Sequence, residues 1–174
     1  GGYIVAESEI TVSSKVAGRI DSLSVNEGDL VRKGDVIALL DSEEWRVQKE
    51  EARANLEKAY LHLKHKQALH QKDMAELKRR RELFKQHLIS PAELDREEKI
   101  AVVSELELDQ AQSDVAVCKK RLELAAIRAA EATIRAPITG TVIDKISDVG
   151  EMLFPMKTFE GISGSAVVTL ADLT

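Results

Sequence analysis

The order of hydrophobic and polar positions divides the chain into a long middle segment with a seven-residue period and two ends made of short β-branched runs. In the first half of the middle segment the period is carried by Leu56, Leu63, His70, Leu77 and Phe84. The second half continues it with Leu94, Ala101, Leu108, Val115, Leu122 and Ala129. A seven-residue repeat under-winds an α-helix and produces a left-handed seam with a partner helix. The pattern predicts two long helices with a seam made mainly of Leu56, Leu63, Leu77, Leu94, Leu108, Val115 and Leu122.

The connection between the two helices is predicted at residues 89–93, with the sequence ISPAE. This sequence places Ser90 at an N-cap, Pro91 at the first helical position and Glu93 at the third, which combines two start signals of a helix. A connection this short makes the helices antiparallel. All nine glycines lie before Asp35 or after Thr139, so no glycine interrupts the middle segment. Each arm of about 40 to 45 residues is expected to be roughly 60 to 68 Å long.

The two ends of the chain resemble each other. Residues 15–31, KVAGRIDSLSVNEGDLV, align without gaps on residues 137–153, PITGTVIDKISDVGEML, which places Gly18 on Gly140 and Gly28 on Gly150. Short β-branched runs between glycine-containing turns indicate small strands and tight connections. We expect the two half-motifs to pair into one β-sandwich, formed by residues 13–41 and 132–174, although two unrelated β-hairpins are an alternative. The α-helical hairpin is expected at residues 42–131, with its tip near 84–93.

Composition and charge favour a helix-rich body over a thick globular core. Of the 174 residues only 3% are aromatic while 32% are charged, and the net charge is −5. An acidic chain with few aromatic residues is not expected to bind nucleic acid. The local charges also support the hairpin, because basic residues end the first helix and acidic residues begin the second, where each sign suits the helix dipole. The basic set is Lys78, Arg79, Arg80, Arg81 and Lys85, and the acidic set is Glu93, Asp95, Glu97 and Glu98; we expect them to pair across the turn.

Residues 27–45, EGDLVRKGDVIALLDSEEW, resemble the first half of a biotinyl or lipoyl carrier domain. A carrier domain needs a lysine whose amine is acylated, but Glu44 stands where that lysine is expected. We therefore expect no covalent cofactor. His62, His65 and His70 lie near one another on the first helix, but no carboxylate or thiolate completes an evident ligand set, so no metal site is predicted. Cys118 falls on the small-residue side of the seam and is interpreted as a buried, unreactive thiol.

From SSKVAGRI (13–20) through TIRAPITGTV (133–142) to VVTLADLT (167–174), the chain resembles the HlyD-like periplasmic adaptors, or membrane fusion proteins, of tripartite efflux pumps and type I secretion systems. In that family a lipoyl-like β-sandwich is interrupted by a long antiparallel α-helical coiled-coil hairpin, inserted where the carrier lysine would be. The resemblance therefore implies an α+β fold of this kind and a protein that is not an enzyme and has no cofactor.

The same resemblance implies partners and a location. It implies that the protein links an inner-membrane transporter, of the ABC or resistance-nodulation-division type, to a TolC-type outer-membrane channel. It also implies a periplasmic protein that assembles as a trimer or hexamer, with an inner-membrane anchor that this chain lacks. Residues 1–12 are expected to be a strand that leads from a β-barrel domain missing here, and ADLT (171–174) is expected to lead back into it. The transporter class and the transported substrate are left open.

Adaptors that dock on a TolC-type channel carry an arginine, three residues, a leucine, six residues and a serine at the hairpin turn. Arg79, Leu83 and Ser90 have this spacing. The resemblance implies that Arg79 donates hydrogen bonds to the channel and that Leu83 packs between helix ends. Ser90 could bind the partner or simply cap its own helix. An alternative function is a self-assembling scaffold for a transporter with no outer-membrane channel, against which the tip triplet argues.

Overall fold

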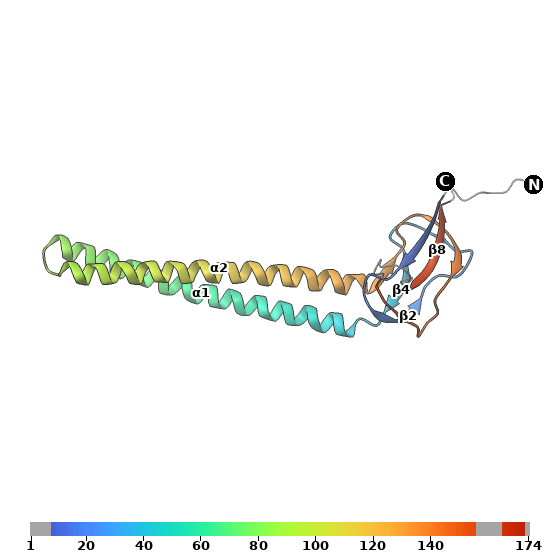
Figure 1. Cartoon of the computed structure of the whole chain (residues 1–174), viewed down its shortest axis with the longest axis horizontal. Helices are drawn as coiled ribbons and strands as arrows, with labels where there is room; N and C mark the ends of the chain where they lie inside the picture. Colours follow the sequence, from blue (N-terminus) through green and yellow to red (C-terminus); the bar gives the residue numbers. More distant parts are fainter. Residues whose placement is uncertain (1–7, 156–164, 173–174) are drawn as a thin grey trace, which may run out of the picture. The chain divides into compact units, whose positions relative to one another are not determined.

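The computed structural model describes residues 8–155 and 165–172, which form an α+β fold made of two compact units. The first unit contains the β-strands and comprises the residues up to Lys49 and from Ala125 onward. The second unit, Glu50–Leu124, contains most of a helical hairpin. A β-sandwich interrupted by a long antiparallel hairpin is the fold class that the sequence predicts, and the structure confirms it (Figure 1).

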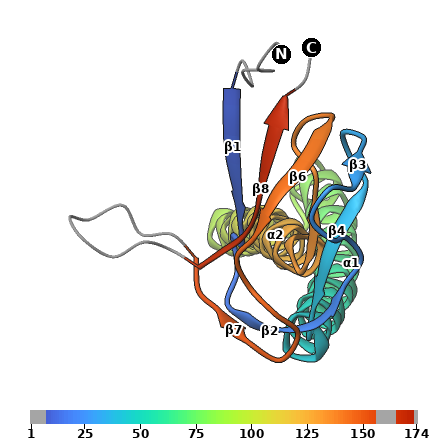
Figure 2. The ribbon, with the colours of Figure 1, turned by 90° about the vertical axis from the view of Figure 1, so that its right-hand side faces the viewer.

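Two four-stranded sheets form the sandwich within the described residues, and all their strand pairs are antiparallel. Figure 2 shows β1, β8 and β6 side by side in one of them. In spatial order the strands of this sheet are β1 (Ser8–Ser13), β8 (Ala166–Asp172), β6 (Gly140–Lys145) and β3 (Leu30–Val31). Those of the other sheet are β5 (Thr133–Arg135), β4 (Val36–Leu40), β2 (Gly18–Leu23) and β7 (Met152–Leu153).

Each sheet combines strands from both half-motifs, so the two halves share one core. Buried and more exposed side chains alternate at the starts of β2 and β6, as expected for a sheet with one buried face, whereas β4 and β8 each bury consecutive residues. The largest fully buried side chains come from both ends of the chain: Ile20, Ile37, Val142, Leu153, Val167, Val168 and Leu170. Neither half-motif can bury its apolar face without the other, which is the physical reason that they pair across the helical insertion.

Matching hydrogen bonds relate the two half-motifs. The amide of Gly28 donates to the carbonyl of Val142 at 2.7 Å, and the amide of Gly150 donates to the carbonyl of Ile20 at 2.9 Å. Gly28 and Gly150 both occupy the left-handed region, with φ of 91° and 92°, where a side chain would be strained. The alternative of two unrelated β-hairpins is therefore wrong.

Strand β1 corrects the predicted start of the sandwich at residue 13. In β1, Ser8 lies opposite Asp172 and Val12 opposite Val168, so residues 8–12 belong to the sheet. In the other half β5 pairs with β4, where Ile134 lies opposite Ala38. The similarity of residues 11–13, TVS, to residues 133–135, TIR, extends the internal repeat to β1. The predicted continuations into a β-barrel at residues 1–7 and 173–174 lie outside the described residues.

Two long helices, α1 (Glu43–Lys85) and α2 (Pro91–Glu131), form the hairpin. Helix α1 ends in a Schellman motif: the amide of Leu88 donates to the carbonyl of Leu83, and the amide of His87 to that of Phe84, both at 3.0 Å. His87 is the left-handed residue of this motif, with φ of 57°. These bonds satisfy carbonyls that the end of a helix leaves without partners, and they turn the chain toward α2.

Buried side chains mark one face of each helix of the hairpin. The described side chains buried on α1 and α2 are Leu77, Ala101, Ser104, Ala111 and Val115. The other predicted seam residues are half-buried: Leu56, Leu63, Leu94, Leu108 and Leu122. Most of the buried residues of α2 are small, so the helix backbones can approach closely, whereas Phe84 at the end of α1 is exposed.

Candidate functional site

The turn of the hairpin is held by a capping box at the start of α2. The Ser90 amide donates to Glu93 Oε2 at 2.9 Å, and the Glu93 amide donates to Ser90 Oγ at 3.2 Å. The Ser90 hydroxyl also lies 3.3 Å from Glu93 Oε2, to which it donates. The Ser90 amide is the main cause of a lowered pKa at Glu93. These bonds satisfy backbone donors that a helix start otherwise leaves unpaired.

The basic run at the end of α1 is tied mostly to acids of its own helix. Glu76 Oε2 lies 2.9 Å from Arg79 Nη1, and Glu76 Oε1 accepts from Arg80 Nε at 2.8 Å. Of the ion pairs in the described residues, only that between Arg81 and Glu98, at 3.5 Å, joins the basic set to the acidic set across the turn. The expected ion pairs between the basic end of α1 and the acidic start of α2 are thus reduced to one. Glu76, one helical turn before the arginines on α1, is as close to them as the acids of α2 and pairs with two of them.

The structure places the tip triplet around this turn. Arg79 is the most exposed of the three arginines, with 69% of its side chain accessible. Leu83 follows one helical turn later on the same face of α1 and is half-buried. Ser90 is exposed, but its hydroxyl is used in the capping box. The arrangement leaves an accessible guanidinium beside an apolar side chain at the end of the hairpin.

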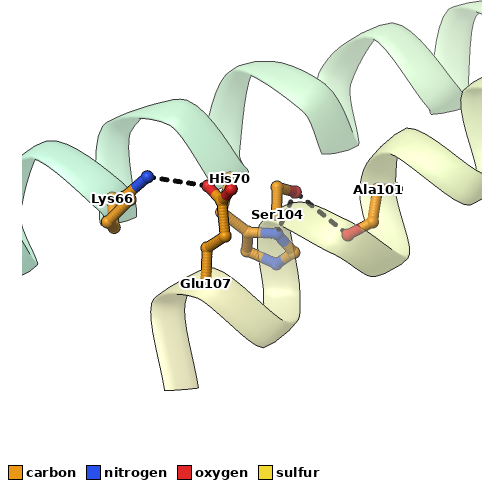
Figure 3. Close-up of polar contacts among 5 residues, drawn as sticks. All are labelled: Lys66, His70, Ala101, Ser104 and Glu107. Carbon is orange, nitrogen blue, oxygen red and sulfur yellow. Dashed lines mark hydrogen bonds and ion pairs between the residues drawn. The ribbon is translucent and has the colours of Figure 1, made fainter. Parts of the chain in front are cut away.

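A polar layer interrupts the seam farther from the tip (Figure 3). His70 Nδ1 lies 2.9 Å from Ser104 Oγ, and the Ser104 hydroxyl donates to the carbonyl of Ala101 at 3.0 Å. The Ser104 hydroxyl has a single hydrogen, and its bond to the Ala101 carbonyl uses that hydrogen. His70 Nδ1 is therefore the donor in the bond between His70 and Ser104. Beside this pair, Lys66 Nζ and Glu107 Oε2 are 2.7 Å apart. His70 thus has a hydrogen-bonding role in the seam, and the described residues contain no group of three or more potential ligands that could hold a metal ion.

The Lys66–Glu107 pair predicts a pH-dependent contribution to hairpin stability. The hydrogen bond from Lys66 lowers the pKa of Glu107 below its ordinary value of 4.5. A carboxyl whose pKa is lower in the folded than in the unfolded state stabilises the fold fully at pH values above its unfolded pKa. This stabilisation is lost as the pH falls through the pKa of the folded state. We expect Glu107→Gln to lower the melting temperature of the hairpin slightly at neutral pH and to have no effect well below pH 4.5. Thermal melts of Glu107→Gln and of the control Glu105→Gln across this range test the prediction; equal curves for both variants would contradict it.

The glycines predicted at turns occupy two kinds of position in the sandwich. Gly28 and Gly150 lie in turns with positive φ, whereas Gly18 and Gly140 begin β2 and β6. At Gly140 a Cβ atom would lie 2.4 Å from the carbonyl oxygen of Ala171, so a close approach of two strands excludes a side chain.

Glu44 lies in the first turn of α1, where the carrier interpretation expected a modified lysine. The neighbouring Trp45 packs against the sandwich core and donates its indole N–H to the carbonyl of Ala17 at 3.3 Å. Sequence reasoning missed this contact, because a single aromatic residue in a first turn does not show what it packs against. Cys118 is a half-buried free thiol in the seam. Within the part of the chain that the structure describes, neither helix is apolar enough over a sufficient length to cross a membrane.

Comparisons with known proteins agree with this architecture. Residues 8–163 match the family model of the CzcB-like barrel-sandwich hybrid domain. The multidrug resistance protein MdtA of Proteus mirabilis is 30% identical over 152 residues, which cover 87% of this chain and 34% of that protein. MdtA of Escherichia coli K12 is 33% identical over 152 residues, covering 87% and 33%. The chain thus spans about a third of the length of these curated relatives.

Solved structures show the same fold. MacA from Actinobacillus actinomycetemcomitans superposes with a TM-score of 0.84 at 22% identity, over 94% of this chain and 52% of that chain. The periplasmic adaptor protein EmrA superposes with a TM-score of 0.62 at 14% identity, over 97% and 73%. The fold is that of a barrel-sandwich hybrid domain interrupted by a helical hairpin. The chain belongs to the periplasmic adaptor, or membrane fusion protein, family, which confirms the resemblance seen in the sequence.

Proposed function

We propose that this chain is part of a periplasmic adaptor that links an inner-membrane transporter to a TolC-type outer-membrane channel. The observation that carries the proposal is the tip of the hairpin, where the exposed Arg79 and the adjacent Leu83 precede a turn closed by Ser90. The protein acts by binding and not by catalysis, and it needs no cofactor. The full-length protein is anchored to the inner membrane.

The chemistry of the tip suits the end of a helical partner. The last carbonyls of a helix have no partner within that helix, and they carry partial negative charge. A guanidinium offers several N–H donors in a planar fork, which suits carbonyl and carboxylate oxygens. Leu83 adds an apolar contact one turn away, so the tip offers both specific hydrogen bonds and buried area to such a partner.

The names of the MdtA relatives, multidrug resistance proteins, support efflux of small molecules as the process served. A transporter of the ABC or the resistance-nodulation-division type would supply the energy for this export. In either case the adaptor contributes the connection between the two membranes.

Self-association as a trimer or hexamer is supported by features of the hairpin away from the seam. Four apolar side chains of α2 outside the seam remain exposed, and two of them, Val117 and Leu124, are seven residues apart. The four are Val103, Leu106, Val117 and Leu124. One groove of the hairpin is lined by three acidic and two basic side chains: Asp73, Asp95, Glu107, Arg96 and Lys99. Another is lined by three basic and two acidic side chains: Lys78, Arg81, Lys85, Glu82 and Glu98. Unlike faces that attract each other give a heterologous contact, and such contacts form a ring when the rotation between neighbouring copies closes.

Cross-linking in cells tests the docking function. The full-length adaptor carries Cys118→Ala and a single new cysteine, Gln86→Cys at the tip, labelled with a photoactivatable maleimide. We expect the tip probe to form an adduct with an outer-membrane channel, because Gln86 is exposed between α1 and α2 and its replacement leaves the triplet intact. Addition of Arg79→Asp is expected to reduce the adduct at least tenfold. It replaces the guanidinium donors with a carboxylate, whose negative charge repels the oxygens of the partner.

The matched control is Gln112→Cys, an exposed position of α2 away from the tip. A channel adduct from both positions would remove the tip as the specific contact. Adducts between adaptor copies alone, with no channel adduct during active transport, would favour the alternative function, a self-assembling scaffold without an outer-membrane channel.

A further inference from the structure

The two polar members of the tip triplet are not isolated side chains. Arg79 forms an ion pair with Glu76 at 2.9 Å, and Ser90 is hydrogen-bonded to Glu93 through both its amide and its hydroxyl. Arg80 joins the first of these pairs, because its Nε donates to the other carboxylate oxygen of Glu76 at 2.8 Å.

Burial distinguishes the roles of these residues. The side chains of Glu76 and Arg80 are 27% and 35% exposed, whereas that of Arg79 is 69% exposed. Glu76 and Arg80 therefore form an inner pair, and Arg79 is the outer cation. Arg79 Nη1 lies 2.9 Å from Glu76 Oε2 while most of the Arg79 side chain is exposed, so its guanidinium can also bond a partner.

The hydroxyl of Ser90 is already occupied in the capping box. It accepts from the Glu93 amide, and its only hydrogen is directed to the Glu93 carboxylate. A bond from this hydrogen to a partner protein would have to break the cap of α2. The geometry thus favours the cap over direct contact as the role of this serine.

We propose that Glu76 and Arg80 are positioning residues for docking, which hold the guanidinium of Arg79 in a fixed orientation. Ser90 acts on docking through the cap that it forms with Glu93. The partner group is a carbonyl or carboxylate oxygen at the end of a helix, bound by the exposed guanidinium of Arg79. This inference rests on the proposed docking function.

The role of Ser90 is tested with the Gln86→Cys probe and two substitutions. Asparagine is as good an N-cap as serine but has no hydroxyl. Alanine has no hydroxyl and is also a poor N-cap. We expect Ser90→Asn to keep the channel adduct within about twofold of wild type, and Ser90→Ala and Glu93→Ala to reduce it by about three- to tenfold. If Ser90→Asn is as defective as Ser90→Ala while Glu93→Ala is normal, the hydroxyl contacts the partner and the inference is overturned.

The role of Glu76 is tested by a double-mutant cycle. Glu76→Gln is expected to reduce the adduct about three- to tenfold, and to have no further effect in an Arg79→Ala background, because coupled residues do not contribute additively. The control Glu82→Gln, which breaks the exposed pair with Lys85 on the same helix, is expected to have no effect. A purely structural role of Glu76 would instead lower the adduct in both backgrounds, and that result would contradict the proposal.

A measurement without the channel tests the network itself. In the full chain, NMR titration of the side-chain carboxyl of Glu76 is compared between wild type and Arg80→Gln. The hydrogen bond from Arg80 is the main cause of the lowered pKa of Glu76, so this pKa should rise when Arg80 is replaced, whereas Lys85→Gln should not raise it. An unchanged pKa of Glu76 in Arg80→Gln would overturn the pairing of these two residues. Absence of any channel adduct from the wild-type adaptor would instead contradict the proposed docking, which keeps the two failures distinct.

Discussion

Replacement of Leu108 by aspartate is expected to unfold the middle of the hairpin while the β-sandwich stays folded. Leu108 is half-buried in the seam of α2 between the buried residues Ser104 and Ala111. Aspartate removes its apolar contacts and brings a charge into the seam, which together cost about 2 to 4 kcal/mol of unfolding free energy. The sandwich has its own core in a separate compact unit, so it does not depend on this contact.

Two signals separate these outcomes. Far-ultraviolet circular dichroism reports mainly on the long helices, and the fluorescence of Trp45, the single tryptophan, reports on the sandwich against which it packs. We expect the helical signal of Leu108→Asp to melt at a lower temperature, with the fluorescence transition unchanged. The matched control is Leu106→Asp, because Leu106 is 62% exposed and lies outside the seam. Equal helix melting of the two variants would show that the seam does not stabilise the hairpin in this way.

Gly140→Ala is expected to destabilise the sandwich more than alanine at any of the other three glycines that the two half-motifs share, Gly18, Gly28 and Gly150. The added Cβ would meet the carbonyl oxygen and carbon of Ala171 at 2.4 and 3.0 Å, and both belong to the backbone of β8. Relief requires β6 and β8 to move apart, although their ladder joins the centre of one sheet. Overpacking of this kind costs typically 1–3 kcal/mol, and a contact with backbone places this variant at about 3 kcal/mol or more.

The internal repeat offers a matched control at Gly18. There the nearest atoms to an added Cβ are Cβ and Cδ1 of Leu40 at 3.2 and 3.3 Å, so a shift of a few tenths of an ångström relieves the contact. We expect Gly18→Ala to cost about 1 kcal/mol, the lower end of the range for overpacked sites. Urea unfolding followed by Trp45 fluorescence measures both variants. A loss for Gly18→Ala that equals or exceeds that for Gly140→Ala would refute the role assigned to the close approach of β6 and β8.

The parts of the fold that the sequence predicted well depend on local signals. The seven-residue columns of the helices mark the face that must be buried, and the capping box at Ser90 and Glu93 needs only residues three positions apart. The end of α1 carried no such signal. Its left-handed residue is His87, whereas the residue that usually marks this position is glycine.

At the candidate site, the residues of the triplet could be found from spacing, but not their hydrogen-bond partners. Arg79, Arg80 and Arg81 each have acidic residues within reach on α1 and α2, and sequence alone does not choose among them. The structure assigns Glu76 to Arg79 and Arg80, and Glu98 to Arg81. The choice depends on the direction of each side chain around its helix, which is set by the packing of the seam.

By itself, the sequence determined the two long helices, the turn between them and the presence of two similar β half-motifs, because these follow from periodicity, capping and glycine spacing over short stretches. Only the tertiary structure decided that β1 joins β8, that each sheet mixes strands of both halves, and that Trp45 packs against the sandwich core. These contacts join residues far apart in the chain. They form because the apolar faces of the two halves can leave water only together, and no local pattern specifies which pairs then meet.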